Sequence, residues 1–258
     1  MTRLLIVRHG ETDWNREGRW QGHAGPGLNE LGRRQAAAIA ARLVHEAPTV
    51  LLSSDLARAT ETAAAVGRRT GLDVRLDPRF REVDVGEWSS LTRAEVAERY
   101  PDAYREWERG TNVGYPGGET FDQLQERCQA ALDELLDRDD GRTIVLVAHG
   151  GSIRAVIGSV LGLDAGRRRL LATGRNCSLS VIEARKGEPV ELALFGGEYQ
   201  DGMLTAYCLV EDVPHIELNG HILVPLQNVA SLHCTSRCDA QDDHWPPRGL
   251  MDDDLGDG

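Results

Sequence analysis

The chain has few cysteines, few aromatic residues and no long hydrophobic run. Its five cysteines lie between Cys128 and Cys238, and an odd number with this spread does not form the disulfide framework of a small secreted domain. No apolar stretch is long enough to span a bilayer, so the sequence predicts a soluble protein. A strand pattern starts almost at the N-terminus and leaves no room for a signal peptide, so we expect a cytoplasmic protein.

Positive charge is also scarce in the last quarter of the chain. Residues 1–195 carry 27 basic and 29 acidic side chains, whereas residues 196–258 carry 2 basic and 12 acidic ones. Most of the net charge of −12 therefore belongs to the C-terminal region. Such a chain is a poor partner for nucleic acid or an anionic membrane, although a local cluster of arginines can still bind a small phosphate.

What the sequence does contain is an apolar run near the N-terminus that stops at a charged turn. Residues 4–7 read Leu-Leu-Ile-Val without alternation, which is typical of a strand buried on both faces of a parallel sheet, and Arg8 and His9 follow. Residues 143–148 repeat this pattern and run into His149. Because ligands bind at the carboxyl ends of strands in open α/β sheets, we expect both histidines at one functional edge.

The hydrophobic periodicity along residues 1–195 predicts one large α/β domain. Further strands are expected at residues 50–53, 74–76, 179–182 and 190–194, the last two forming a hairpin at the sheet edge. Longer helices are expected after Asn29 and over residues 57–70, 120–138 and 153–161. Irregular loops are expected at residues 14–29 and 79–91, and a helix-rich insertion at residues 92–118.

Residues 196–258 form an acidic C-terminal extension of a different character. Short strand-like pieces occur at residues 204–210 and 221–226, and the last twenty or so residues are expected to be disordered because they are acidic and poor in apolar side chains. The sequence leaves four roles open for this extension: added strands, screening of a pocket, formation of a homodimer, or no role.

The motif at residues 8–12, Arg-His-Gly-Glu-Thr, followed by Asn15 and later by His149 and Gly150, resembles the histidine phosphatase superfamily of phosphoglycerate-mutase-like proteins. The resemblance covers about residues 3–195. It implies a three-layer α/β/α sandwich with a mostly parallel central sheet and a helical insertion over the active site. It also implies a phosphomonoester hydrolase that forms a phosphohistidine and needs neither a metal nor another cofactor.

His9 is the candidate nucleophile, because a neutral imidazole can attack phosphorus and carry the phosphoryl group. The resemblance implies that a backbone carbonyl binds its other ring nitrogen. Arg8 and Arg58 are candidate phosphate clamps, since a guanidinium group offers fixed, permanently charged donors. His149 is expected to donate a hydrogen bond to the transferring phosphoryl group.

Glu82 aligns with the acidic residue that, in this family, protonates the leaving oxygen and then activates water. Asp84 and Glu87 have the same chemistry, and only the resemblance favours Glu82. Four further residues are expected to contact the substrate: Asn15, Gln21, Gly22 and Gly150.

The expected substrate is a small phosphate ester, such as a sugar phosphate, a phosphoglycerate-type compound or a nucleoside-like phosphate. Residues 18–26 and 86–88 are similar to the broad-specificity phosphatases of the family, so we favour a phosphatase. The alternative is a cofactor-dependent phosphoglycerate mutase, and a more remote one is a non-catalytic module that binds a phosphorylated ligand. Five aromatic residues are candidates either for the pocket mouth or for packing: Trp14, Trp20, Trp88, Trp107 and Tyr115.

Overall fold

The computed structural model describes residues 1–111, 114–137, 141–163, 167–171, 174–185, 190–200, 203–205, 215–218 and 222–225. The predictions of a disordered tail and of a role for the acidic extension lie largely outside these residues. Within them, no helix combines the length and the apolar character that crossing a membrane requires.

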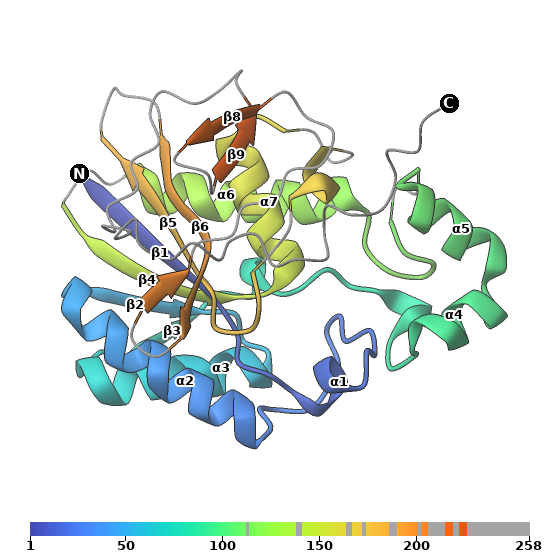
Figure 1. Ribbon diagram of the computed structural model, residues 1–258, viewed down its shortest axis with the longest axis horizontal. Coiled ribbons are helices and arrows are strands. Elements are labelled where there is room, and N and C mark those ends of the chain that lie inside the picture. The colour runs from blue at the N-terminus through green and yellow to red at the C-terminus, as the bar shows by residue number, and fades with distance from the viewer. Residues whose placement is uncertain are drawn as a thin grey trace, which may run out of the picture.

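A seven-stranded mixed sheet with the order β3-β2-β4-β1-β5-β6-β7 forms the centre of the molecule (Figure 1). Four strands are parallel: β1 (Thr2–Arg8), β2 (Val50–Ser53), β3 (Val74–Leu76) and β4 (Thr143–Ala148). The strands that extend the sheet beyond β1 pair antiparallel: β5 (Leu179–Ala184), β6 (Glu191–Gln200) and β7 (Met203–Thr205). A separate antiparallel pair contains β8 (His215–Leu218) and β9 (Ile222–Pro225).

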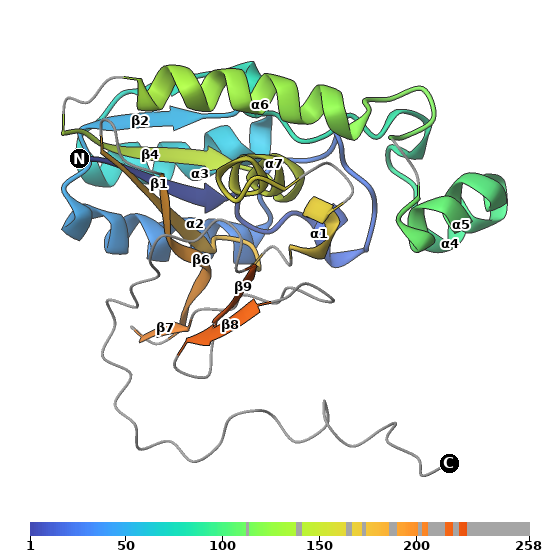
Figure 2. The ribbon, with the colours of Figure 1, turned by 90° about the horizontal axis from the view of Figure 1, so that it is seen from above.

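Helices cover both faces of the sheet, as Figure 2 shows from above. On one face, α2 (Glu30–Leu43) and α3 (Ala57–Thr70) pack against Leu5 and Val7, while α6 (Phe121–Leu136) and α7 (Gly150–Val160) pack against Leu4 and Ile6 on the other. Successive residues of β1 therefore enter different cores, which explains why its sequence shows no polar alternation. The predicted three-layer sandwich is confirmed, with the parallel pairing confined to β1–β4.

The insertion contains α4 (Arg93–Arg99) and α5 (Pro101–Arg109), which lie beyond the end of the sheet where β1 and β4 terminate (Figures 1 and 2). Trp20 reaches it from the N-terminal loop and makes edge-on ring contacts with Trp88, Trp107 and Tyr115. Trp88 is 1% exposed, so this residue is a packing group rather than part of a pocket mouth.

Several boundaries differ from the sequence predictions, and two of the differences change the description of the fold. The expected loop at residues 14–29 begins with a short helix, α1 (Asp13–Arg16), because Thr12 and Asn15 form a capping box. Strand β6 continues to Gln200 and pairs with β7, so the sheet extends beyond residue 195 and the β5–β6 hairpin is not its edge.

Candidate active site

His9 leaves the sheet directly after β1 and is 2% exposed. Its backbone nitrogen donates to the Ala148 carbonyl at 3.0 Å, and its ring Nδ1 lies 2.7 Å from the Gly10 carbonyl oxygen. Nδ1 therefore carries the proton and Nε2 keeps a free electron pair. Burial, followed by the charges of Arg58 and Arg8, holds the pKa of His9 well below 6.5. The ring is neutral, as a nucleophile must be.

Arg8 and Arg58 approach the same cavity and are held by backbone carbonyls. The Arg8 Nη1 donates to the Gly174 carbonyl at 2.9 Å, while the Arg58 Nη2 and Nη1 donate to the Gly22 and Ala24 carbonyls at 2.7 and 2.9 Å. Desolvation lowers the pKa of Arg58 to about 10, so it still carries its charge at neutral pH. The Nε–H of each arginine is buried without an acceptor, and an oxyanion in the adjoining cavity would offer one.

His149 follows β4, and its ring centroid lies 5.1 Å from that of His9. The parallel register places Arg8 opposite Ala148, which brings the two strand ends together. The His149 Nε2 lies 2.8 Å from the Ser54 Oγ, and the ring is fully buried. Burial lowers the pKa of His149 well below 6.5, so the ring is neutral and is able to take part in hydrogen bonds.

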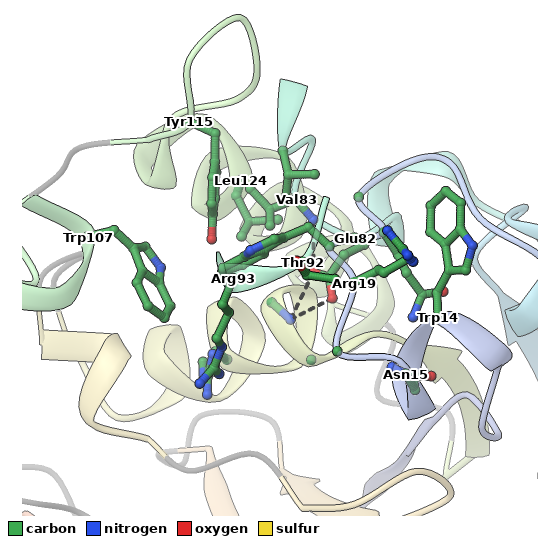
Figure 3. A pocket seen from close by; sticks show the side chains of 18 of the residues that line it. Trp14, Asn15, Arg19, Glu82, Val83, Thr92, Arg93, Trp107, Tyr115 and Leu124 are labelled. Atoms are coloured by element: carbon green, nitrogen blue, oxygen red, sulfur yellow. Dashed lines mark hydrogen bonds between the residues drawn. The ribbon is translucent and has the colours of Figure 1, made fainter. Parts of the chain in front are cut away.

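Glu82 presents its carboxylate to the N-terminus of α7. Its Oε1 accepts hydrogen bonds from the backbone nitrogens of Gly151 and Val83, both at 2.9 Å (dashed lines in Figure 3 mark the bonds within the pocket). A side chain at Gly151 would collide with this carboxylate, since its Cβ would lie 2.2 Å from the Glu82 Oε1. Glu82 lines the cavity, whereas Asp84 and Glu87 do not, so the geometry favours Glu82 over its two rivals.

The remaining predicted residues all border the cavity. The Asn15 Oδ1 accepts from the Thr12 backbone nitrogen at 3.1 Å, and the Gln21 Oε1 accepts from the Thr12 hydroxyl at 3.1 Å. Gly22 has a φ of +52° and packs so tightly that a Cβ would lie 2.7 Å from a Val85 methyl carbon. Gly150 starts α7. The cavity, of about 970 Å³, thus joins every predicted site residue except the fully buried His149.

The sequence reasoning missed the residue that holds the loop carrying Glu82. Arg127 of α6 pairs with Glu119, its Nε lying 2.6 Å from the Oε1. The same guanidinium donates, at 2.7 to 2.9 Å, to the three backbone carbonyls of Arg79, Arg81 and Glu82. One side chain therefore fixes the backbone that leads into the candidate acid and the carbonyl of the acid itself.

Two further residues of the site were also missed. The Asn176 Nδ2 donates to the His9 carbonyl at 2.9 Å, and nothing in the local sequence indicates this contact. Arg154 lines the cavity from α7, four residues after Gly150. Helical periodicity could have placed it on the same side of the helix. Among the described residues, no group of three His, Cys, Asp or Glu side chains is arranged to hold a metal ion.

Comparison with known proteins places this geometry in a known context. A family model described as the histidine phosphatase superfamily, branch 1, matches residues 4–195. A bifunctional protein of Mycobacterium tuberculosis is 40% identical over 166 residues, which cover 64% of this chain and 45% of that protein. The chain therefore spans less than half of that relative's length.

Two other matches cover nearly the whole of the similar protein. Phosphoserine phosphatase 1 of Hydrogenobacter thermophilus is 35% identical over 195 residues, covering 75% of this chain and 92% of that protein. The structure of a mycobacterial glucosyl-3-phosphoglycerate phosphatase in complex with VO3 superimposes with a TM-score of 0.69 at 36% identity, covering 75% of this chain and 98% of the other.

Proposed function

The chain belongs to branch 1 of the histidine phosphatase superfamily, and we propose that it is a phosphomonoester hydrolase acting on a small phosphorylated metabolite through a phosphohistidine at His9. One observation carries the proposal: a buried neutral imidazole whose Nδ1 is held by the Gly10 carbonyl, between two guanidinium groups. That arrangement leaves Nε2 as the nucleophile and provides positive charge for the phosphoryl oxygens.

In the first step, the His9 Nε2 attacks phosphorus, a P–N bond forms and the bond from phosphorus to the ester oxygen breaks. Arg8 and Arg58 balance the charge on the non-bridging oxygens, and His149 contributes a hydrogen bond. The leaving oxygen takes the electron pair of the broken bond and a proton from the Glu82 carboxyl, so the alcohol leaves neutral.

In the second step, the Glu82 carboxylate takes a proton from a water molecule, whose oxygen attacks the phosphorus of the phosphohistidine. The P–N bond breaks, its electron pair returns to Nε2, and inorganic phosphate leaves. Glu82 is again protonated and His9 again neutral, so the chain is ready for another cycle.

The experiment measures phosphate release from a panel of phosphate esters, including phosphoserine, glucosyl-3-phosphoglycerate and 3-phosphoglycerate, with excess EDTA and with His9→Ala as the blank. We expect turnover in EDTA and a radioactive phosphoryl group on His9 after a quench that avoids acid. Label on another side chain, or loss of activity with the chelator, would contradict the mechanism.

The same assay separates the proposed hydrolase from the alternatives. A mutase would interconvert 2- and 3-phosphoglycerate, in the presence of a bisphosphoglycerate, faster than it releases phosphate. A non-catalytic module would bind phosphate esters without turnover. The cytoplasmic location and the homodimer stay predictions.

A further inference from the structure

Asn176 precedes β5, does not line the cavity and has no part in the proposed steps. The side-chain nitrogen of an asparagine carries two hydrogens. Both are engaged in Asn176, whose Nδ2 donates to the His9 carbonyl at 2.9 Å and to the Asn15 Oδ1 at 3.3 Å. A single side chain therefore joins the backbone of the candidate nucleophile to a residue that borders the cavity.

The contact with Asn15 determines which end of that amide is the oxygen. One atom of the Asn15 amide faces both the Asn176 Nδ2 and, at 3.1 Å, the Thr12 backbone nitrogen. Both of these groups can only donate, so the atom that they face must be the oxygen. The nitrogen of the Asn15 amide must then occupy the other position.

The Asn15 Nδ2 makes no hydrogen bond within the part of the chain that the structure describes. Asn15 borders the same cavity as His9 and Arg58 (Figure 3). An amide nitrogen only donates, and an oxyanion is a suitable acceptor for it. The donors around the Asn15 oxygen therefore leave the nitrogen for a phosphoryl oxygen.

The contact with His9 holds the peptide group that links His9 to Gly10. The carbonyl of this peptide accepts from Asn176, and its nitrogen, which belongs to Gly10, donates to the Thr62 hydroxyl at 3.0 Å. The next carbonyl along the chain, that of Gly10, lies 2.7 Å from the His9 Nδ1. Holding this peptide therefore holds the acceptor that keeps the His9 Nε2 free for attack.

We propose that Asn176 is a positioning residue for phosphoryl transfer: it turns the amide nitrogen of Asn15 toward the phosphoryl oxygens and holds the peptide that follows His9. This inference rests on the proposed hydrolase activity. Asn176 acts through these two residues and does not touch the substrate. Its substitution should therefore weaken the binding of a phosphoryl-like anion mainly when Asn15 is present.

The test is a double-mutant cycle that measures the Kd of vanadate by titration calorimetry, with every variant made in the whole chain. Vanadate is the probe, because the mycobacterial complex described above contains VO3. We expect Asn15→Ala to raise Kd by about tenfold or more, and Asn176→Ala by about five- to tenfold. In the Asn15→Ala background, Asn176→Ala should raise Kd by less than about threefold, since only the contact with His9 is then lost.

Asn29→Ala is the matched control, because Asn29 also makes two side-chain hydrogen bonds and lies outside the cavity lining. Its Nδ2 donates to the Glu11 Oε1 at 2.9 Å, and its Oδ1 accepts from the Gly32 backbone nitrogen at 2.8 Å. The variant loses the N-cap of α2 and should be less stable than wild type. It should nevertheless leave the vanadate Kd within about twofold of wild type.

An Asn176→Ala effect of the same size in both backgrounds would overturn the inference. An unchanged Kd in Asn176→Ala, or a wild type that does not bind vanadate, would do the same. If Asn176→Ala does not fold, Asn176→Asp decides, because aspartate has the same shape and lacks both N–H donors. It should weaken vanadate binding by a larger factor in wild type than in Asn15→Ala. The titration needs no turnover, so a protein that shows the expected coupling but releases no phosphate from any ester would refute the proposed function alone.

Discussion

The two ends of the cavity are built in different ways. The phosphoryl end contains Arg8, His9 and Arg58, with the fully buried His149 beside His9, and all four residues are held at strand ends or on the helix that follows. Backbone carbonyls accept hydrogen bonds from the His9 ring and from the guanidinium groups of Arg8 and Arg58. The leaving-group end contains Trp107, Tyr115 and Arg154, and most of its surroundings come from the insertion and the loops around it.

In the proposed hydrolase, the phosphoryl end would carry out the chemistry and the leaving-group end would contact the rest of the substrate. At the phosphoryl end His9, Arg58 and His149 are buried, and the register of β1 and β4 brings the ends of these strands together, so the groups suit a reaction that needs fixed distances. The leaving-group end depends on ring packing, such as the contact of 5.1 Å between the ring centroids of Trp20 and Trp107. Such packing can change without disturbing the sheet.

The largest effect should come from the phosphoryl end. Replacing His9 with alanine removes the nucleophile, and we expect kcat to fall by on the order of 10⁴-fold for every ester. Steady-state phosphate release is the measurement. His45→Ala, an exposed histidine outside the cavity, is the matched control and should retain wild-type activity. A His9→Ala variant with more than a tenth of the wild-type rate would show that another group acts as the nucleophile and accepts the phosphoryl group.

Glu82→Gln should have the next largest effect, and the effect should depend on the leaving group. For an alkyl phosphate we expect kcat/KM to fall by about 10²- to 10³-fold, because the poor leaving group needs a proton. For p-nitrophenyl phosphate the loss should be smaller, since its leaving group departs as an anion. Asp84→Asn, which neutralises a carboxylate outside the cavity lining, is the control. Equal losses on both esters would argue against Glu82 as the acid.

Arg127→Met should lower kcat/KM with the same dependence on the leaving group as Glu82→Gln, but by smaller factors. The variant loses three hydrogen bonds to the backbone of residues 79–82, so the Glu82 carboxyl group is no longer held in position. We therefore expect about a tenfold fall in kcat/KM for an alkyl phosphate. The fall for p-nitrophenyl phosphate should again be smaller, which a general loss of structure would not produce. Glu119→Gln, which weakens the partner of Arg127, should give the same pattern more weakly.

The comparison also explains what the sequence could predict. Strands at residues 50–53 and 74–76 and the helix at residues 57–70 are confirmed with the predicted bounds, because apolar periodicity and end signals such as Gly71 are local. The family match supports the predicted phosphatase function. The contacts of Arg127 and Asn176 join residues 45 to 167 positions apart. No local pattern encodes such contacts, so they could not be predicted.

The helix α1 was missed for another reason. It has four residues, fewer than the window over which a hydrophobic period can be recognised, and it depends on one capping box. The spacing from Gly150 to Arg154, by contrast, was present in the sequence. Sequence motifs indicate the candidate catalytic residues. A residue such as Arg154 can be assigned to the site only once the structure shows that its helix borders the cavity.

The smallest expected effect concerns stability and arises from the two buried histidines, His9 and His149. Burial holds the pKa of His9 and of His149 below 6.5 in the folded protein, so the unfolded chain binds protons first as the pH falls. The free energy of unfolding should thus be highest above pH 6.5. Between 6.5 and the lower folded-state pKa, it should decline by up to about 1.4 kcal/mol per pH unit for each ring. Urea unfolding at pH 7.5 and 5.5 measures this decline, and His9→Asn should reduce it by about half. An unchanged decline in that variant would mean that His9 is not held neutral by the fold.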